Sequence, residues 1–279
     1  MKFFKMHGCG NDYVYIDGFT ETVADESAAA VKLSDRHFGV GGDGIIIIKK
    51  GNAADFEMVM YNADGSRAEM CGNAIRCVAK YVYDKGYINS TSFTIESMGA
   101  VKYIDVTVEN GSVISAKVDM GAPILDAKDI PVHGSGRVIK EKITSCKRNF
   151  EMTCVSMGNP HAVMFIDECP KDFDLNLYGA QFEQNTAVFP NRINAEFANV
   201  IDRRNIEMRV YERGTGETLA CGTGACATAV AAILNGYADN EVTIHLLGGD
   251  LEISWSGNDG DSVFMTGPAE YVFSGEIDI

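Results

Sequence analysis

The chain has 279 residues, of which 24 are basic and 39 acidic, and its formal net charge is −15. The length suggests one or two domains, and the hydrophobic content of 46% is sufficient for a buried core. An acidic chain without a basic patch argues against binding to nucleic acid or to an anionic membrane. The N-terminal residues contain no apolar run of signal-peptide length, so the eight cysteines are expected to be reduced in the cytoplasm.

In the first half, alternating apolar residues predict a strand that ends at Asp17, and a helix is predicted over 27–38 with Asp25 or Ser27 as its N-cap. Further strands are predicted over 45–49 and 56–61, then a helix from Cys71 to Gly86, and finally strands over 93–95, 101–108 and 113–120. The segment 39–44 matches G-x-G-x-x-G, but it follows a helix and opens a strand, so a turn is favoured over a phosphate site.

The second half repeats this order of elements after a proline-containing segment, 121–129, which is expected to connect two domains. Strands are predicted over 162–167 and 206–211, a strongly apolar helix over 225–234, and strands over 241–246, 251–255 and 262–266.

The two halves also match residue by residue at a fixed offset. Cys71-Gly72 and Cys221-Gly222 are separated by 221 − 71 = 150 residues, and the same offset aligns the segment 57–87 with 207–237 without a gap. The chain therefore contains one structural unit twice, with a Cys-Gly pair at the start of a buried helix in each copy.

A cysteine at a helix start has a chemical use. The helix N-terminus is expected to lower the thiol pKa and to offer N–H donors to a carboxylate. If two such ends face one substrate, one thiolate can remove a proton from the α-carbon while the other thiol returns a proton to the opposite face. Either cysteine alone would be read as packing, but the equivalent pair favours function. Cys77 and Cys226 are expected in the core, as are Cys9, Cys146, Cys154 and Cys169.

Other polar residues leave alternatives open at this point. His161 could equally be a surface or a functional residue. The Glu212-Arg213 pair could be a solvated ion pair, or it could receive an ammonium and a carboxylate. Asparagines beside strands are commonly turn formers, but several together could bind a zwitterion; they are Asn11, Asn62, Asn159 and Asn194.

Taken together, these motifs resemble the diaminopimelate epimerases over essentially the full length. The residues that carry the resemblance are Gly8-Cys9-Gly10-Asn11-Asp12, Asn62-Ala63-Asp64-Gly65-Ser66, Cys71-Gly72-Asn73 with Arg76-Cys77, Gly158-Asn159-Pro160-His161, Glu212-Arg213-Gly214 and Cys221-Gly222-Thr223-Gly224.

The resemblance implies an α/β (α+β) fold with two pseudo-symmetric domains, each a curved and mostly antiparallel sheet wrapped around a central helix. The expected domains are residues 1–120 plus 267–279, which carry Cys71, and residues 121–266, which carry Cys221. The implied activity is the interconversion of LL- and meso-diaminopimelate without a cofactor or a metal, in lysine and peptidoglycan-precursor biosynthesis. A cytoplasmic homodimer that binds a small-molecule substrate is also implied.

The resemblance further implies the roles of the site residues. Cys71 and Cys221 would be the acid–base pair, with His161 and Glu212 near the reacting centre. The implied substrate-binding residues are Asn11, Asn62, Gly72, Asn73, Asn159, Asn194, Glu212, Arg213, Gly222 and Thr223. Some members of the family have glutamine where this chain has Gly44, so no substrate contact is assigned to that position.

Four other functions remain to be distinguished. A non-catalytic amino-acid-binding module would not need a paired acid and base. A proline or hydroxyproline racemase would use the same two-thiol logic, but proline has no distal carboxylate for Arg213. A phenazine-pathway isomerase of similar fold would not be expected to keep both cysteines. A thiol-redox protein would join Cys71 and Cys221 in a reversible disulfide, although the chain lacks a C-x-x-C motif.

Overall fold

The computed structural model describes residues 1–68 and 70–278 and divides into two compact units. Unit 1 comprises Met1–Val118 and Thr266–Ile279, and unit 2 comprises Asp119–Met265. The chain crosses from one unit to the other within two strands, β8 (Ser112–Gly121) and β17 (Val263–Gly267). Unit 2 is thus a continuous stretch inserted into unit 1.

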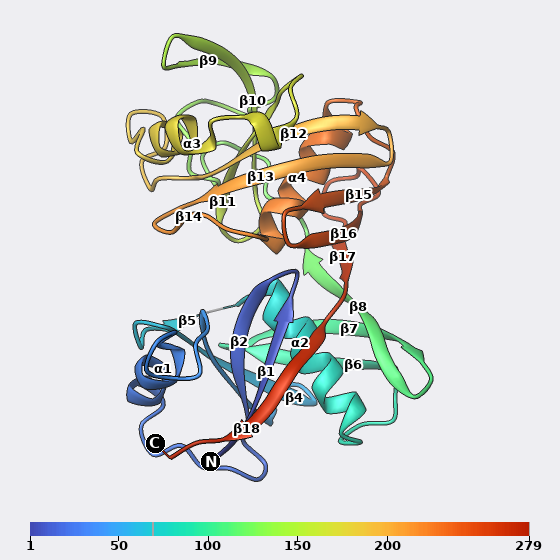
Figure 1. The fold of residues 1–279 in the computed structure, drawn as a ribbon. Coiled ribbons are helices and arrows are strands. Elements are labelled where there is room, and N and C mark those ends of the chain that lie inside the picture. The colour runs from blue at the N-terminus through green and yellow to red at the C-terminus, as the bar shows by residue number, and fades with distance from the viewer. Residues whose placement is uncertain (69, 279) are drawn as a thin grey trace. The chain divides into compact units, whose positions relative to one another are not determined.

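Unit 1 contains two helices, α1 (Glu26–Ser34) and α2 (Gly72–Asp84). Its strands, besides β8, are β1 (Lys2–Gly8), β2 (Asn11–Asp17), β3 (Gly44–Lys50), β4 (Phe56–Asn62), β5 (Arg67–Ala68), β6 (Ser92–Ser97), β7 (Ala100–Glu109) and β18 (Glu270–Glu276). The pairings β2–β3 and β4–β6 are parallel, and the others, among them β1–β2, β1–β18 and β3–β4, are antiparallel. Figure 1 shows β18 alongside β1, with both chain ends at this unit.

The central strands of unit 1 are covered on both faces, which explains their continuous apolar sequence. Ile45 and Ile47 of β3 pack in one cluster with Leu33 of α1. Successive strand residues point to opposite faces, so Ile46 and Ile48 face the other side. That side carries α2, which packs on β1 and β2 (Figure 1).

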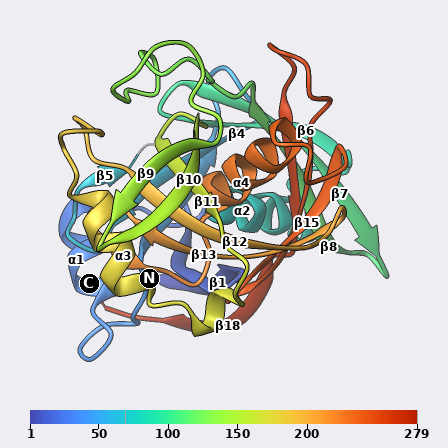
Figure 2. The ribbon, with the colours of Figure 1, turned by 90° about the horizontal axis from the view of Figure 1, so that it is seen from above.

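Unit 2 contains the helices α3 (Leu175–Glu183) and α4 (Gly222–Leu234) and the short 3-10 helix Pro170–Asp172. Its strands, besides β17, are β9 (Glu141–Ser145), β10 (Arg148–Ser156), β11 (Pro160–Phe165), β12 (Asn194–Asp202), β13 (Asn205–Glu212), β14 (Gly216–Glu217), β15 (Glu241–Leu246) and β16 (Gly249–Ser254). Figure 2 shows α4 against strands of its own unit, and α4 packs on β10, β11, β12, β15 and β16. The opposite face of β12 is covered by α3, through Phe182 and Phe197.

The sequence repeat extends to the elements and their pairing. Helices α2 and α4 begin 222 − 72 = 150 residues apart, and strands β3 and β12 begin 194 − 44 = 150 residues apart. The order of parallel and antiparallel pairs from β1 to β7 recurs from β10 to β16. The two units are therefore copies of one topology.

The register of the parallel pairs refines the alignment before each helix. Val14 pairs with Ile45 in unit 1, and Ala162 pairs with Ala195 in unit 2. Since 195 − 45 is 150 while 162 − 14 is 148, the second strand of each copy is aligned by an offset of 148. Asn11 then corresponds to Asn159, and Tyr13 corresponds to His161.

Some sequence-based expectations on the fold were wrong. Helix α1 ends at Ser34 rather than at residue 38, because the Asp35 carboxylate accepts hydrogen bonds from the backbone N–H groups of His37 and Phe38. Strands β1, β5, β9, β10, β12 and β14 and helix α3 were not expected. Cys146 is exposed and Cys169 is half-buried, whereas the other core predictions, Cys9, Cys77, Cys154 and Cys226, are confirmed.

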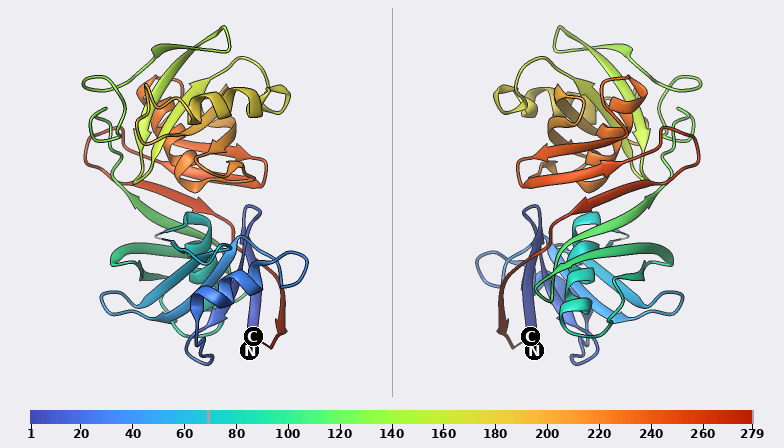
Figure 3. Two further views of the ribbon diagram at one scale, coloured as in Figure 1. Left: turned by 90° about the vertical axis from the view of Figure 1, so that its left-hand side faces the viewer. Right: turned by 90° about the vertical axis from the view of Figure 1, so that its right-hand side faces the viewer.

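The N-terminal and C-terminal segments of the chain pair with each other in unit 1. The terminal amino group of Met1 donates to the carbonyl of Ile277 at 2.9 Å, and the two ends lie side by side in both views of Figure 3. Among the described residues, no helix is both long and apolar enough to cross a membrane.

Candidate active site

Cys71 is the N-cap of helix α2, and its side chain is partly exposed. Its thiol donates to Oδ1 of Asn11 at 3.2 Å, and Nδ2 of Asn73 lies 3.5 Å from the same oxygen. Of the expected substrate-binding residues of unit 1, Asn11, Gly72 and Asn73 therefore gather at the start of α2. Asn62 lies at the end of β4, where its amide donates to Ser66 in the adjoining turn.

The start of α2 is fixed by Arg76, which is fully buried. Its guanidinium donates to the Gly72 carbonyl and to Oδ1 of Asn73, both at 3.0 Å, and to the Pro268 carbonyl at 3.1 Å. A Cβ at Gly8 would lie 2.9 Å from this guanidinium, so only glycine fits there. Arg76 thereby orients the first turn of the helix, a role that the sequence did not reveal.

Tyr13 of unit 1 is buried beside Cys71. Burial raises the pKa of the Tyr13 phenol far above its ordinary value, and the neighbouring Cys71 adds to this rise. A Cβ at Gly44 would lie 2.1 Å from the Tyr61 carbonyl oxygen and 3.0 Å from the Tyr13 ring. A glutamine therefore does not fit at position 44 on this backbone, and Tyr13 occupies the space beside it.

Cys221 is the N-cap of helix α4 and is buried. Its sulfur accepts a hydrogen bond from the backbone N–H of Gly224 at 3.4 Å and lies 3.5 Å from Oγ1 of Thr223. These two contacts lower the thiol pKa, as expected of a helix start. The net result is nevertheless the opposite of the expectation. Burial raises the pKa of Cys221 well above its ordinary value, and the carboxyl groups of Glu212 and Glu196 act in the same direction.

His161 is fully buried next to another buried side chain, Glu196. Its Nδ1 lies 2.7 Å from Oε1 of Glu196, and its Nε2 lies 3.0 Å from Oδ1 of Asn159. Burial raises the pKa of the Glu196 carboxyl, and the contact with His161 opposes that rise. His161 is thus an interior residue that links Glu196 to Asn159, and the surface alternative is excluded.

Glu196 also lies beside the first turn of α4. A Cβ at Gly224 would come within 2.8 Å of Oε1 of Glu196 and 3.3 Å of Sγ of Cys221. Glycine at position 224 therefore allows Glu196 to approach the helix start. The sequence analysis missed Glu196, although a glutamate between Ala195 and Phe197 in an otherwise apolar strand is a signal that could have identified it.

The remaining residues form a loop at the end of β13. Asn194 is buried and joins two segments, since its Nδ2 donates to the Pro160 carbonyl and its Oδ1 accepts from the backbone N–H of Arg213, both at 2.9 Å. Oε1 of Glu212 accepts from the Thr218 hydroxyl. The exposed Arg213 side chain donates to the Asn191 carbonyl at 3.1 Å.

A second buried carboxylate supports this loop. Oε1 of Glu183 accepts from the Gly214 N–H at 2.9 Å and pairs with Arg192. Unit 2 therefore brings Cys221, Thr223 and Glu212 together near Glu196 and His161, and it places Asn159 and Asn194 on the neighbouring strand ends. Among the described residues, no group of three or more His, Cys, Asp or Glu side chains is arranged to hold a metal ion.

Similar proteins were found at both the sequence and the structure level. The family model for diaminopimelate epimerase matches residues 3–125 and 153–272. Proteins named diaminopimelate epimerase from Acetivibrio thermocellus and Agathobacter rectalis are 51% and 53% identical to this chain over 280 and 287 residues. Each match covers all of this chain, together with 99% of the first relative and 100% of the second.

Solved structures with low sequence identity share the fold. A phenazine biosynthesis protein of Bacillus anthracis is 17% identical with a TM-score of 0.72, and the match covers 100% of this chain and 99% of that one. A probable proline racemase of Agrobacterium radiobacter is 12% identical with a TM-score of 0.70, covering 100% and 93%. The fold class is therefore the mixed α+β architecture expected from the sequence. With half of its residues identical to curated relatives along its whole length, the chain belongs to the diaminopimelate epimerase family.

Proposed function

We propose that this protein interconverts LL-2,6-diaminopimelate and meso-diaminopimelate by proton transfer at one α-carbon, with Cys71 and Cys221 as the proton-transfer groups. The observation that carries the proposal is the recurrence of a Cys-Gly pair at the start of an inner helix in both units, α2 and α4. Membership in the family and the names of the relatives support it.

The proposed reaction balances without an external reactant. A thiolate of one cysteine takes the α-proton, the C–H bond breaks, and its electron pair passes onto the α-carbon and the adjoining carboxylate. The thiol of the other cysteine then donates its proton to the opposite face and becomes the thiolate. The stereocentre is inverted and the two cysteines have exchanged protonation states, so the return reaction starts from the product state.

The helix starts supply what the carbanion needs. A helix start offers backbone N–H donors and a partial positive charge, so Gly72-Asn73 and Gly222-Thr223 are suited to hold the reacting carboxylate. His161 and Glu212 would act close to the reacting carbon. The amide oxygens of Asn11 and Asn159 would accept from the ammonium groups, and Arg213, with Asn62 and Asn194, would select the distal end.

The raised pKa of Cys221 adds a requirement to this mechanism. A buried thiol beside two carboxyl groups is held neutral, so Cys221 suits the role of proton donor in the substrate-free protein. It can act as the base only when positive charge, such as the ammonium of the substrate, arrives nearby. We therefore expect epimerisation to depend on an intact α-amino group.

Isotope exchange tests the function directly. Incubation with LL-diaminopimelate in deuterium oxide should give α-deuteration, measured by mass spectrometry, and inversion, measured by optical rotation. A parallel incubation with L-proline should give neither. Exchange with proline and not with diaminopimelate would replace the proposal by a proline racemase.

Cysteine variants test the mechanism. Cys71→Ala and Cys221→Ala should each lower kcat/KM by at least about 10²-fold, because each removes a proton-transfer group. Cys146→Ala is the matched control, since Cys146 is exposed in the β9–β10 hairpin and should be silent. Normal rates in either catalytic-cysteine variant would exclude the two-thiol mechanism. A disulfide between Cys71 and Cys221 that forms and breaks during turnover would instead support a redox protein.

The location, oligomeric state and partners of the enzyme are proposed from its membership in the family. We expect a cytoplasmic homodimer that acts on a small molecule in lysine and peptidoglycan-precursor biosynthesis, with no nucleic-acid or membrane partner. Sedimentation equilibrium across a range of protein concentrations distinguishes the homodimer from a monomer.

A further inference from the structure

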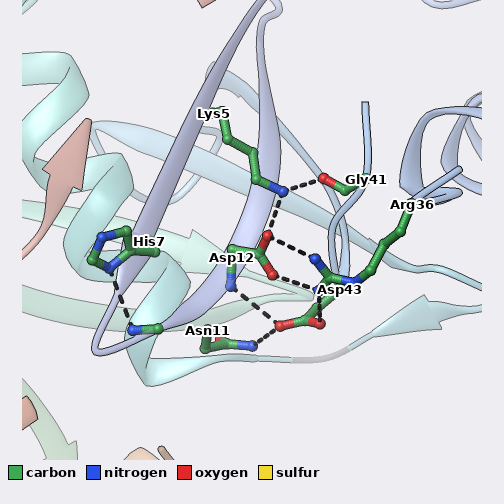
Figure 4. Close-up of polar contacts among 8 residues, drawn as sticks. Lys5, His7, Asn11, Asp12, Arg36, Gly41 and Asp43 are labelled. Carbon is green, nitrogen blue, oxygen red and sulfur yellow. Dashed lines mark hydrogen bonds and ion pairs between the residues drawn. The ribbon is translucent and has the colours of Figure 1, made fainter. Parts of the chain in front are cut away.

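A charged cluster lies beside Asn11 (Figure 4). Arg36 binds both carboxylate oxygens of Asp12, at 3.2 and 2.7 Å, and one oxygen of Asp43 at 3.0 Å. The buried Lys5 lies 2.5 Å from Asp12 and also donates to the Gly41 carbonyl. The cluster ties β1 and β2 to the turn before β3, and nothing in the proposed reaction uses it.

One member of this cluster binds Asn11 directly. Oδ2 of Asp43 accepts from Nδ2 of Asn11 at 2.6 Å and from the Asp12 backbone N–H at 3.2 Å, while Oδ1 of Asp43 accepts from Arg36. An ionised carboxylate is an acceptor only, so the NH₂ end of the amide must face Asp43. Oδ1 of Asn11 must then face the Cys71 thiol at 3.2 Å and Nδ2 of Asn73 at 3.5 Å.

The direction of the amide determines which form of Cys71 it favours. An amide oxygen accepts a hydrogen bond from S–H and repels a thiolate, whereas an NH₂ group at the same position would favour the thiolate. We propose that Asp43 is a positioning residue that holds the Asn11 amide with its oxygen toward Cys71, and so keeps Cys71 as the thiol in the substrate-free protein. The proposal deepens the proposed function, in which Cys71 is a proton-transfer group. Like Cys221, Cys71 then releases its proton to solvent and becomes a thiolate base only when the substrate ammonium brings positive charge nearby.

The Asp43→Ala variant releases this direction. Oδ2 of Asp43 also accepts from the Asp12 backbone N–H, so an asparagine at 43 would keep its oxygen toward Asn11, whereas alanine removes the acceptor altogether. The Asn11 amide can then turn its NH₂ group to Cys71 and stabilise the thiolate. The titratable groups that interact electrostatically with Cys71 are Tyr13 and Tyr15 from β2 and Cys77 from α2, and Tyr13 also hydrogen-bonds to Asn11. None of these groups is substituted in the variants.

The test measures how much of Cys71 is thiolate at each pH, and it needs no substrate. The alkylation rate of Cys71 by iodoacetamide is measured from pH 5 to 10, with the modified peptide quantified by mass spectrometry. In Asp43→Ala, the pH midpoint should fall by at least about half a pH unit. Asp12→Ala is the matched control, because it removes the same charge from the same cluster and leaves the Asp43–Asn11 hydrogen bond. It should shift the midpoint by clearly less.

Two further variants separate positioning from a loss of structure. Asn11→Ala removes the acceptor oxygen without touching Asp43, so it should also lower the midpoint. In that background, Asp43→Ala should cause no additional shift, since the amide it acts through is gone. An unchanged midpoint in Asp43→Ala, an equal shift in Asp12→Ala, or full additivity with Asn11→Ala would each overturn the proposal. Failure of the proposed function would appear separately, as absence of deuterium exchange in the wild-type protein.

Discussion

Nδ1 of His161 lies 2.7 Å from Oε1 of Glu196, and both side chains are completely buried. The other ring nitrogen, Nε2, lies 3.0 Å from Oδ1 of Asn159, so both ring nitrogens face oxygen atoms and the contact with Glu196 fixes the orientation of the ring. Removing one partner of such a buried pair is strongly destabilising, because the other partner loses the contact that compensates for its desolvation.

The first prediction follows from this pair. Glu196→Ala should lower the free energy of unfolding by about 3–5 kcal/mol, whereas Glu196→Gln keeps an oxygen acceptor and should cost about 1–2 kcal/mol. Urea unfolding measures both. Glu252→Ala, at an exposed position of β16, should change stability by less than about 0.5 kcal/mol. Equal losses for the alanine and glutamine variants would show that the hydrogen bond is unimportant.

Gly224 provides a second prediction. Alanine in a helix interior is normally favoured over glycine by about 1 kcal/mol. At position 224 the new Cβ would meet Oε1 of Glu196 at 2.8 Å, so Gly224→Ala should instead destabilise the protein by about 1–3 kcal/mol and lower the epimerisation rate. The double variant Gly224→Ala with Glu196→Ala should show little of this clash. Strict additivity of the two unfolding free energies would contradict the argument.

Gly44 offers a steric test on the other unit. Gly44→Ala would place a Cβ 2.1 Å from the Tyr61 carbonyl oxygen in the β3–β4 pair, and should cost at least about 2 kcal/mol of stability. Gly99→Ala is the comparison, because Gly99 has a positive φ of 82° and open space around it. Strain alone should cost it about 1 kcal/mol. Thermal unfolding would contradict the steric account if the two variants were equally stable.

Asp12 predicts a dependence of stability on pH. Burial alone would raise the pKa of its carboxyl, but hydrogen bonds from Arg36 and Lys5 outweigh that effect and hold the pKa below its usual value. A depressed folded-state pKa gives stability that is complete above the unfolded-state pKa and is lost as the pH falls through the folded-state pKa. Asp12→Asn should therefore be about 2–4 kcal/mol less stable at pH 7.

The same gap should hold down to about pH 5 and shrink as the pH falls below about 4, where the wild-type carboxyl becomes protonated. Urea unfolding of both proteins at a series of pH values gives the difference directly, since the other carboxyl groups are common to both. A difference that stayed constant down to pH 2 would show that the Asp12 charge does not contribute.

Much of the fold could be predicted from the sequence because its signals are local. The apolar runs around Ile45–Ile48 and in α4 are long enough to identify a buried strand and a buried helix. Because the two halves match at a fixed offset, an element identified in one half supports the equivalent element in the other. Helix α3 was missed because it is short and has Gly179, a poor helix former, in its interior. Strand β10 was missed although Phe150, Met152 and Cys154 alternate with Glu151 and Thr153, a strand signal that the sequence does contain.

In the candidate site, too, local features were predictable from the sequence and long-range contacts were not. The position of both cysteines as N-caps was predictable from Cys-Gly before an apolar helix. The raised pKa of Cys221 was not predictable, because it depends first on burial and then on Glu212 and Glu196. Glu196 precedes Cys221 by 25 residues and approaches it through the packing of β12 on α4. The role of Arg76 could not be predicted either. Its partners, Gly72, Asn73 and Pro268, come from segments that only the folded chain brings together.

The insertion of unit 2 into unit 1 has a consequence for biosynthesis. Strand β1 is among the first segments to leave the ribosome, but one of its two neighbours, β18, is among the last. Unit 2 is contiguous and can complete its own pairing while unit 1 still lacks an edge. During translation, unit 1 therefore cannot complete its sheet until β18 has been synthesised, and one edge of β1 stays unpaired until then.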